Sequence, residues 1–232
     1  MPFDLDPPGL LFYNATALES AGVDVAQIET YDDLLEAARQ YQAAVPGGSK
    51  PIHLEQSAFL GQLQLEMYAS QLGTSIADEN GELRIDSDAY RQILGWLDTV
   101  QSEGLGTRAE YLSPSDVGPL ESGQQVFYPW AIWFSFAPPE QQLTQTSGDW
   151  RAMPPLPAWE EGGARSGAMG GSSFVLPKAG GGERRPRVAV LRVPHVRRGR
   201  LHRGVGGPER HLPERLGDVD PGVPARRGPG DP

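Results

Sequence analysis

The chain has 232 residues, no cysteine and a formal net charge of −10, from 30 acidic and 20 basic side chains. Without cysteine it cannot form disulfides or thiolate metal sites. The acidic balance argues against a nucleic-acid partner, because phosphate binding needs a positive surface. No basic-plus-apolar signal segment is visible at the start, and no apolar run reaches the roughly 18 residues that a membrane span needs.

The charge is divided unevenly along the chain. The last fifty residues, 183–232, hold 12 of the 20 basic residues, all of them arginine, and six of the 30 acidic ones. Residues 1–182 therefore carry a charge of about −16, and the tail carries about +6. These are two different kinds of sequence.

The tail is also restricted in composition. Only nine residue types occur in 183–232, and each of them can be encoded by a codon that begins with G or C. In a gene rich in G and C, a frame that takes the old third base as its first produces this alphabet. We therefore predict a frameshift near Gly180 to Glu183 and an out-of-frame, disordered tail over 179–232. An arginine-rich nucleic-acid arm is the alternative interpretation, but it does not explain the alphabet.

The first predicted elements are a strand and two helices. An apolar run at 10–13 follows two prolines and a glycine, which indicates a buried strand. Asn14 can cap a short helix that ends at Gly22, where a positive φ is expected. Thr30 can cap a longer helix with two aspartates in its first turn. The predicted buried stripe of that helix is Tyr31, Leu34, Leu35, Ala38 and Tyr41.

Further strands and helices follow along the chain. Strands are predicted at 51–54, 150–153 and 174–176, and helices at 57–72, about 88–102 and within 112–123. The helix at 57–72 carries Phe59, Leu60, Leu63, Met67 and Leu72 near helical spacing. The helix at 88–102 is expected to present Tyr90, Ile93, Leu94, Leu97 and Val100 to a core.

Three short motifs occur in order within 10–44, namely "FYN", "ESAG" and "TYDDLLEAARQY". Together they resemble the sugar-type extracellular solute-binding proteins of ABC importers. In that family the second lobe opens with a strand ending in "YN", a helix ending in "AG" and a helix that begins like "TWDEL". The turn "NGEL" and the later "GG" and "VLPK" resemble the same family, again in order.

The resemblance implies an α/β fold of the type II periplasmic-binding-protein kind, represented mainly by its C-terminal lobe. Residues 1–12 would be the remnant of the strand that crosses the hinge between the lobes, and 13–178 would be the C-terminal lobe. On this resemblance, the family's signal peptide and most of its N-terminal lobe would be absent before Met1. An intact family member is extracytoplasmic, either membrane-anchored or periplasmic.

The function implied by the resemblance is binding rather than catalysis, with no cofactor. Such a protein captures a sugar or oligosaccharide, acts as a monomer, and delivers the ligand to the permease subunits of an ABC transporter. With half of the cleft missing, this chain alone is expected to bind sugar weakly or not at all. A carbohydrate-active enzyme of the glycoside-hydrolase type and a non-functional gene remnant are the alternatives.

The densest aromatic segment, at 127–136, supplies the first candidate ligand contacts. "SGQQVFYPWAIW" resembles a family segment that contains a tryptophan, to which Trp133 would correspond. Ala131 stands where that segment has glycine. A flat indole suits sugars, because the C–H face of a pyranose stacks on it. Trp133 and, secondarily, Trp130 are therefore predicted sugar platforms. Each ring is also compatible with a place in the core.

Further candidates come from both ends of the lobe. Asp4 and Asp6 have strand spacing, so both carboxylates can face a cleft. A pair of carboxylates also fits glycoside hydrolysis, and a solvated chain end fits equally well. The resemblance places Gly170 and Gly171 at the cleft, where the backbone can approach a ligand, although they also fit a simple turn.

Two residues of the helix at 57–72 complete the predicted ligand set. Phe59 and Gln62 occupy the part of the lobe where the family often places an aromatic or amide contact. His53 is the only histidine before the tail, so neither a histidine-based metal site nor Ser/His catalysis is predicted.

Overall fold

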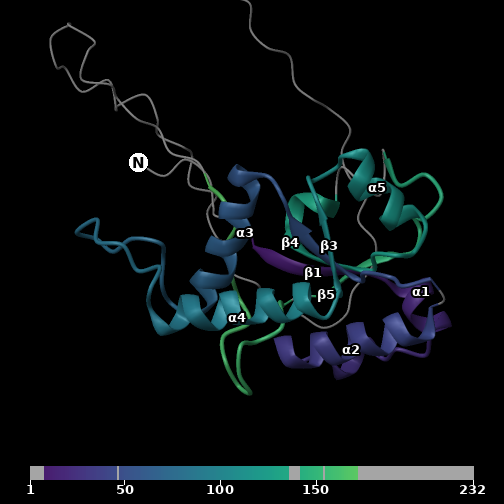
Figure 1. Ribbon diagram of the computed structural model, residues 1–232, viewed down its shortest axis with the longest axis horizontal. Coiled ribbons are helices and arrows are strands. Elements are labelled where there is room, and N and C mark those ends of the chain that lie inside the picture. The colour runs from purple at the N-terminus through teal and green to yellow at the C-terminus, as the bar shows by residue number, and fades with distance from the viewer. Residues whose placement is uncertain (1–7, 46, 136–141, 154, 172–232) are drawn as a thin grey trace, which may run out of the picture. The chain divides into compact units, whose positions relative to one another are not determined.

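The computed structural model describes residues 8–45, 47–135, 142–153 and 155–171 (Figure 1). The described residues all belong to one unit of the chain, Met1–Lys178. Asp4, Asp6, the strand predicted at 174–176 and the tail at 179–232 lie outside the described residues. The domain boundaries expected at residues 12 and 178 stay predictions.

A mixed five-stranded sheet forms the centre of the unit. Its strands are β1 (Gly9–Asn14), β2 (Ile52–Glu55), β3 (Gly106–Ala109), β4 (Phe127–Ala131) and β5 (Trp150–Met153), in the order β3-β2-β4-β1-β5. β2 pairs in parallel with β3 and β4. β1 runs antiparallel to both of its neighbours, β4 and β5. The sequence analysis predicted β1, β2 and β5 but did not anticipate β3 or β4.

Helices connect the strands and cover the sheet. They are α1 (Ala15–Ser20), α2 (Tyr31–Ala44), α3 (Ala58–Gln71), α4 (Asp88–Ser102) and α5 (Pro114–Glu121), with short 3-10 helices η1 (Val25–Gln27) and η2 (Ile132–Ser135). In Figure 1, α2 and α4 run below the sheet and α5 lies above it. This arrangement confirms the predicted α/β class.

The predicted helix caps are confirmed. The Asn14 side chain accepts a hydrogen bond from the backbone N–H of Ala17 at 2.9 Å. Thr30 and Asp33 form a reciprocal capping box, in which each side chain accepts from the backbone of the other residue. Gly22 has a φ of +72°, as a helix end in the left-handed region requires. Local chemistry therefore sets where α1 and α2 begin and where α1 ends.

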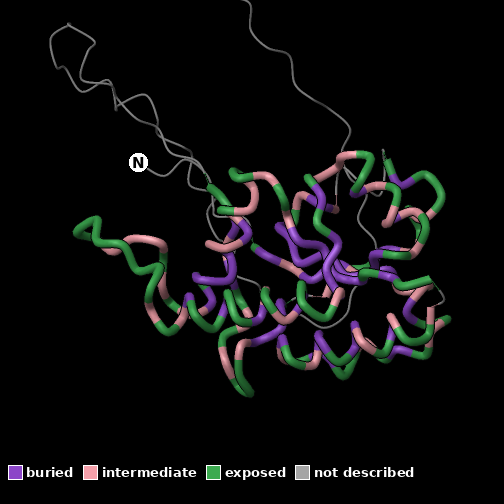
Figure 2. Tube along the Cα trace, in the orientation of Figure 1, coloured by how far each residue is buried: buried purple, intermediate pink, exposed green. Residues whose placement is uncertain are grey.

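The buried face of α2 is the one that the sequence predicts. The buried faces of α3 and α4 differ from those that apolar spacing indicates (Figure 2). All five stripe residues of α2 are buried, and in Figure 2 buried and exposed stretches alternate along this helix. In α3, Phe59 is 71% exposed, and the buried face instead includes Gln64 and Gln71. In α4, Leu94 is 45% exposed, and Trp96 is buried in its place. The prediction of Leu94 as a core position was wrong, whereas Phe59, predicted as a ligand contact, is exposed.

The reason is hydrogen bonding that apolar spacing does not reveal. Gln71 Nε2 donates to the carbonyls of Pro157 and Ala164, at 3.0 and 3.2 Å. The indole N–H of Trp96 donates to the carbonyl of Tyr31 at 3.1 Å. Buried carbonyls need such donors, because leaving them unpaired costs free energy.

Replacement of Gly106 by alanine should destabilise the fold. A Cβ at this buried strand position would lie 2.6 Å from Leu54 Cδ1 and 3.1 Å from Val100 Cγ1. Overpacking of this kind costs about 1–3 kcal/mol. The loss is measured as the free energy of unfolding in urea.

Gly95→Ala is the matched control for Gly106→Ala. No atom lies within 4 Å of a Cβ at this helical position, so alanine should stabilise α4 by about 0.5–1 kcal/mol. Two variants of equal stability would contradict the packing described for Gly106.

Candidate functional site

The carboxyl ends of the parallel strands meet at one edge of the sheet, which we call the carboxyl edge. Glu55 pairs with Ala109, so β2 and β3 end side by side. Ligands of open α/β sheets bind outside the carboxyl ends of the strands. The loops at this edge are residues 55–57, 110–113 and 132–135.

Two further segments join the carboxyl edge because β1 is antiparallel. Gly9, the first residue of β1, pairs with Ala131, the last residue of β4. The Ile132 N–H donates to the Pro8 carbonyl at 3.0 Å. The Gly9 N–H donates to the carbonyl of Gly167 at 2.8 Å, which places 167–171 beside the start of β1. Five chain segments therefore surround one edge.

Trp133 and Gly170 are brought together there. A Cβ at position 170 would lie 3.4 Å from Trp133 Cη2, so the glycine backbone approaches the edge of the indole. Trp133 is half-buried, and both Gly170 and Gly171 are exposed. Their φ angles of +91° and +129° lie in the region that favours glycine. Trp133 and Gly170 thus lie in contact, and Gly171 follows on the same exposed segment.

Trp130 lies in the core instead. It is fully buried, as are all residues of β4. Its indole stacks on Tyr111, with ring centroids 5.2 Å apart and an interplanar angle of 17°. It also meets the His53 ring edge-on at 5.5 Å. In this structure no face of the Trp130 ring is open to a sugar, and the residue acts as a support beneath the edge.

The two predicted residues of α3 lie apart from Trp133, which does not line the cavity that Gln62 shares with Glu55 and Ser57 of the carboxyl edge. Phe59 and Gln62 are exposed near the start of the helix. Gln62 lines a cavity of about 670 Å³ between α3 and α4. Its lining is mainly apolar and includes Leu65, Leu94 and Leu97. The structure does not bring Gln62 and Phe59 together with Trp133.

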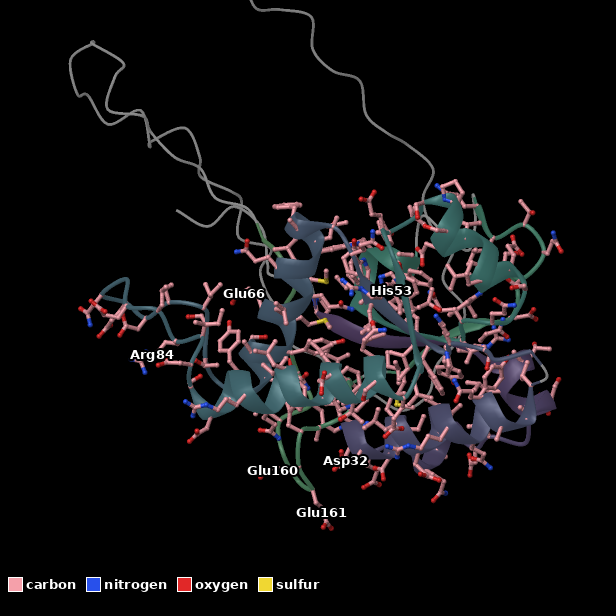
Figure 3. All side chains as sticks on the ribbon, in the orientation of Figure 1. Asp32, His53, Glu66, Arg84, Glu160 and Glu161 are labelled. Carbon is pink, nitrogen blue, oxygen red and sulfur yellow. The ribbon has the colours of Figure 1, made fainter. Side chains whose placement is uncertain are left out.

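A buried polar cluster lies beneath the carboxyl edge, and the sequence analysis missed it. The side chains of His53, Glu55 and Asp116 have no exposed area. His53 Nδ1 lies 3.2 Å from Asp116 Oδ1, and His53 Nε2 lies 3.6 Å from Glu55 Oε2. Neither ring nitrogen forms a hydrogen bond of good geometry, although both lie close to a carboxylate oxygen. Figure 3 shows His53 deep inside the molecule, whereas Glu161 projects outward.

The two carboxylates of this cluster bind backbone amides of the edge loops. Glu55 accepts from the N–H of Ser57 at 2.7 Å and from the N–H of Tyr111 at 2.9 Å. Asp116 accepts from the N–H of Leu112 at 2.9 Å and from the Tyr128 hydroxyl at 2.8 Å. Charge-assisted hydrogen bonds of this kind are stronger than neutral ones.

These contacts shift two pKa values in opposite directions. Burial acts to raise the pKa of Glu55, but the contact with His53 and the hydrogen bonds from Ser57 and Tyr111 lower it to about 2. Burial acts to lower the pKa of His53, but the contacts with Asp116 and Glu55 outweigh burial and raise it above its ordinary value. The charged form of each group is therefore favoured.

The cluster has the residue types of an acid–base site but not the access of one. General acid–base catalysis requires hydrogen-bond reach to a substrate, and all three side chains are covered. Within the described ranges, no group of three or more His, Cys, Asp or Glu side chains is arranged to hold a metal ion. None of the helices in the described part of the chain has the length and apolar character that a membrane crossing requires.

Comparison with known proteins identifies the family. The family model of the bacterial extracellular solute-binding proteins matches residues 1–181. The chain belongs to this family. The resemblance noted in the sequence is thereby confirmed.

Curated relatives and solved structures agree with this assignment. The chain is 30% identical over 178 residues to the arabinooligosaccharide-binding protein of Halalkalibacterium halodurans, covering 72% of this chain and 37% of that protein. It is 27% identical over 176 residues to the arabinooligosaccharide-binding protein of Bacillus subtilis, covering 73% and 38%. The sugar-binding protein MalE of Xanthomonas citri superposes with a TM-score of 0.57 at 20% identity, over 71% of this chain and 41% of that one.

These comparisons bear on the fold and on the alternatives. The structural likeness confirms a periplasmic-binding-protein-like fold, of which this chain covers a portion. The chain spans less than two fifths of the length of either curated relative. The family and its neighbours are binding proteins rather than enzymes, so the glycoside-hydrolase alternative is not favoured.

The buried position of Glu55 predicts an acid-dependent loss of stability. Its folded-state pKa lies below the ordinary value of 4.5, so its contribution is complete above that pH and is lost as the pH falls toward about 2. Between about pH 5 and pH 3, the wild-type chain should lose about 2 kcal/mol more unfolding free energy than Glu55→Gln. Urea denaturation at each pH measures the difference.

Glu79→Gln is the matched control, since Glu79 is an exposed glutamate. It should follow the wild-type pH dependence. Parallel pH profiles for wild type and Glu55→Gln would show that the Glu55 carboxylate contributes nothing through its charge.

Proposed function

We propose that this chain forms the ligand-binding lobe of an extracytoplasmic protein that captures a sugar or oligosaccharide and delivers it to an ABC permease. The observation that carries the proposal is the contact between Trp133 and Gly170 at the carboxyl edge. It joins a flat aromatic surface to an exposed backbone at the place where α/β sheets bind ligands.

The chemistry of this surface suits a carbohydrate. The indole offers an apolar face for sugar C–H groups, while nearby polar groups can accept or donate to hydroxyls. Gly170 and Gly171 are exposed and have no side chain, so their backbone can approach a ligand closely. Asp4 and Asp6 are proposed as additional acceptors for sugar hydroxyls.

The ligand class follows from the relatives. Two of them carry the name arabinooligosaccharide-binding protein, so an arabino-oligosaccharide is the first ligand to test. The protein would act as a monomer. Ligand would bridge two lobes and shift the equilibrium from an open to a closed form, and the closed form would dock on the permease.

Replacement of Trp133 by alanine should weaken sugar binding. Loss of a stacking surface corresponds to about 0.5–1.5 kcal/mol, or roughly a 2- to 10-fold rise in Kd. The measurement is a titration of the ¹⁵N-labelled full chain with arabino-oligosaccharide, followed by the indole N–H signals of its five tryptophans, a method that detects weak binding.

Trp159→Ala is the matched control. Trp159 is also half-buried, but it packs on Tyr31, with ring centroids 4.3 Å apart, and not at the carboxyl edge. The Kd of Trp159→Ala for arabino-oligosaccharide should equal that of the wild-type chain. If both variants lose affinity equally, or if the Trp133 indole signal is unmoved by a sugar that binds, the proposed platform is refuted.

A further inference from the structure

Two buried carboxylates bind the loop Glu110–Ser113 at the carboxyl edge. Leu112 has a φ of +60°, a left-handed conformation that is strained for a non-glycine residue. Its N–H donates to Asp116, and the N–H of the preceding residue, Tyr111, donates to Glu55. Two successive amides of a strained loop are therefore bound by two different buried carboxylates.

His53 lies between those carboxylates and is the charge that compensates them. With the imidazole protonated, the cluster of His53, Glu55 and Asp116 carries one net negative charge, and with the imidazole neutral it carries two. An uncompensated buried charge is costly, and removing one partner of such a cluster is strongly destabilising. Opening the loop would relieve that cost by admitting water to the carboxylates.

We propose that Glu55, Asp116 and protonated His53 are positioning residues, which hold the loop Glu110–Ser113 in its ligand-facing conformation and release it when His53 loses its proton. The description of the loop as ligand-facing rests on the proposed function. The coupling between His53 and the loop rests on the contacts alone. Ligand affinity should accordingly be lower at alkaline pH.

The groups that face His53 indicate that protonation of His53 itself controls the net charge of the cluster. Glu55 faces it from β2 and Asp116 from α5, while Tyr128 of β4 stacks on its ring at 4.0 Å and 10°. Tyr111 of the loop packs against Tyr128 at 6.4 Å.

The neighbouring phenols do not titrate in the relevant range. Burial, with a contribution from Asp116, raises the pKa of Tyr111 to about 12, and the same causes raise that of Tyr128 well above its ordinary value. The remaining charged groups near the cluster do not alter the balance. Arg108 of β3 and Glu66 of α3 line the cavity that Glu55 also borders. Among the described residues, neither forms an ion pair with the cluster.

The sign of the pH effect follows from the direction of the His53 shift. Its pKa is raised in the folded state, because the two carboxylates outweigh burial. The contribution of the protonated ring is complete below the ordinary value of 6.5 and is lost as the pH rises through the raised value. The loop should therefore be ordered at about pH 6 and should open more often at about pH 9.

Amide hydrogen exchange of the full chain tests this without any ligand. After correction for intrinsic exchange, protection of the Tyr111 and Leu112 amides should fall at least about tenfold from about pH 6 to about pH 9. The amide of Tyr31, which donates to the Ala158 carbonyl at 2.9 Å, should keep its protection. The pH of the fall should coincide with the titration of the His53 ring, observed by NMR.

His53→Gln removes the titrating group and should abolish the pH step at Tyr111 and Leu112. If His53→Gln does not fold, the comparison of exchange in the wild-type chain at about pH 6 and about pH 9 decides alone. Unchanged protection of both amides in the wild-type chain, or an equal fall at Tyr31, overturns the proposal. So does a pH step that persists in folded His53→Gln.

Sugar titration separates this proposal from the proposed function. If arabino-oligosaccharide binds, its Kd should rise about tenfold over the same pH range in wild type, and an unchanged Kd overturns the positioning role. If none of the sugars tested binds at either pH, the proposal that this chain by itself binds sugar fails. The exchange measurement then decides the coupling between His53 and the loop.

Discussion

The direction of β1 is the constraint on which the rest of the structure depends. β1 lies between β4 and β5 and runs against both, so its first residue emerges at the edge where the parallel strands end. Gly9 is required there, because a Cβ would collide with Met67 and Leu156. The same strand start binds Gly167, which brings the segment carrying Gly170 against Trp133. One reversed strand thus assembles the candidate site.

The polar residues of α3 make this assembly possible. Gln64 donates to the carbonyl of Pro129 in β4 at 3.3 Å and accepts from the Glu55 N–H at 3.2 Å. β4 pairs with β2 only at its first residue, Phe127, so Pro129 lies beyond that pairing and its missing N–H costs nothing on that side. A glutamine on the covering helix satisfies the groups that the diverging strands leave unpaired. This requirement explains why α3 lacks an apolar stripe.

Local signals made much of the fold predictable. Asn14 and Thr30 were recognisable as caps because a cap needs only its own first turn. β3 was not recognisable, since "GTRA" has no apolar pattern and becomes a strand through its pairing with β2. The buried cluster was hidden for the same reason. His53 acquires Asp116 as a neighbour only when the chain closes over a separation of more than sixty residues. Trp130 and Trp133 look alike in sequence, and only the end of β4 between them separates core from surface.

At the carboxyl edge the charged side chains are buried, and the residues on the accessible surface are neutral. Glu55 and Asp116 are covered, while Trp133, Gly170 and Gly171 form the accessible surface. Such a division suits an uncharged ligand, which gains little from an exposed ion but gains from a surface that is already ordered. Ordering a loop at the moment of binding costs affinity, and a loop held beforehand avoids that cost. The hydrogen bond from Leu112 to Asp116 offsets the backbone strain at Leu112 within the folded lobe. The free energy of ligand binding therefore does not have to compensate that strain.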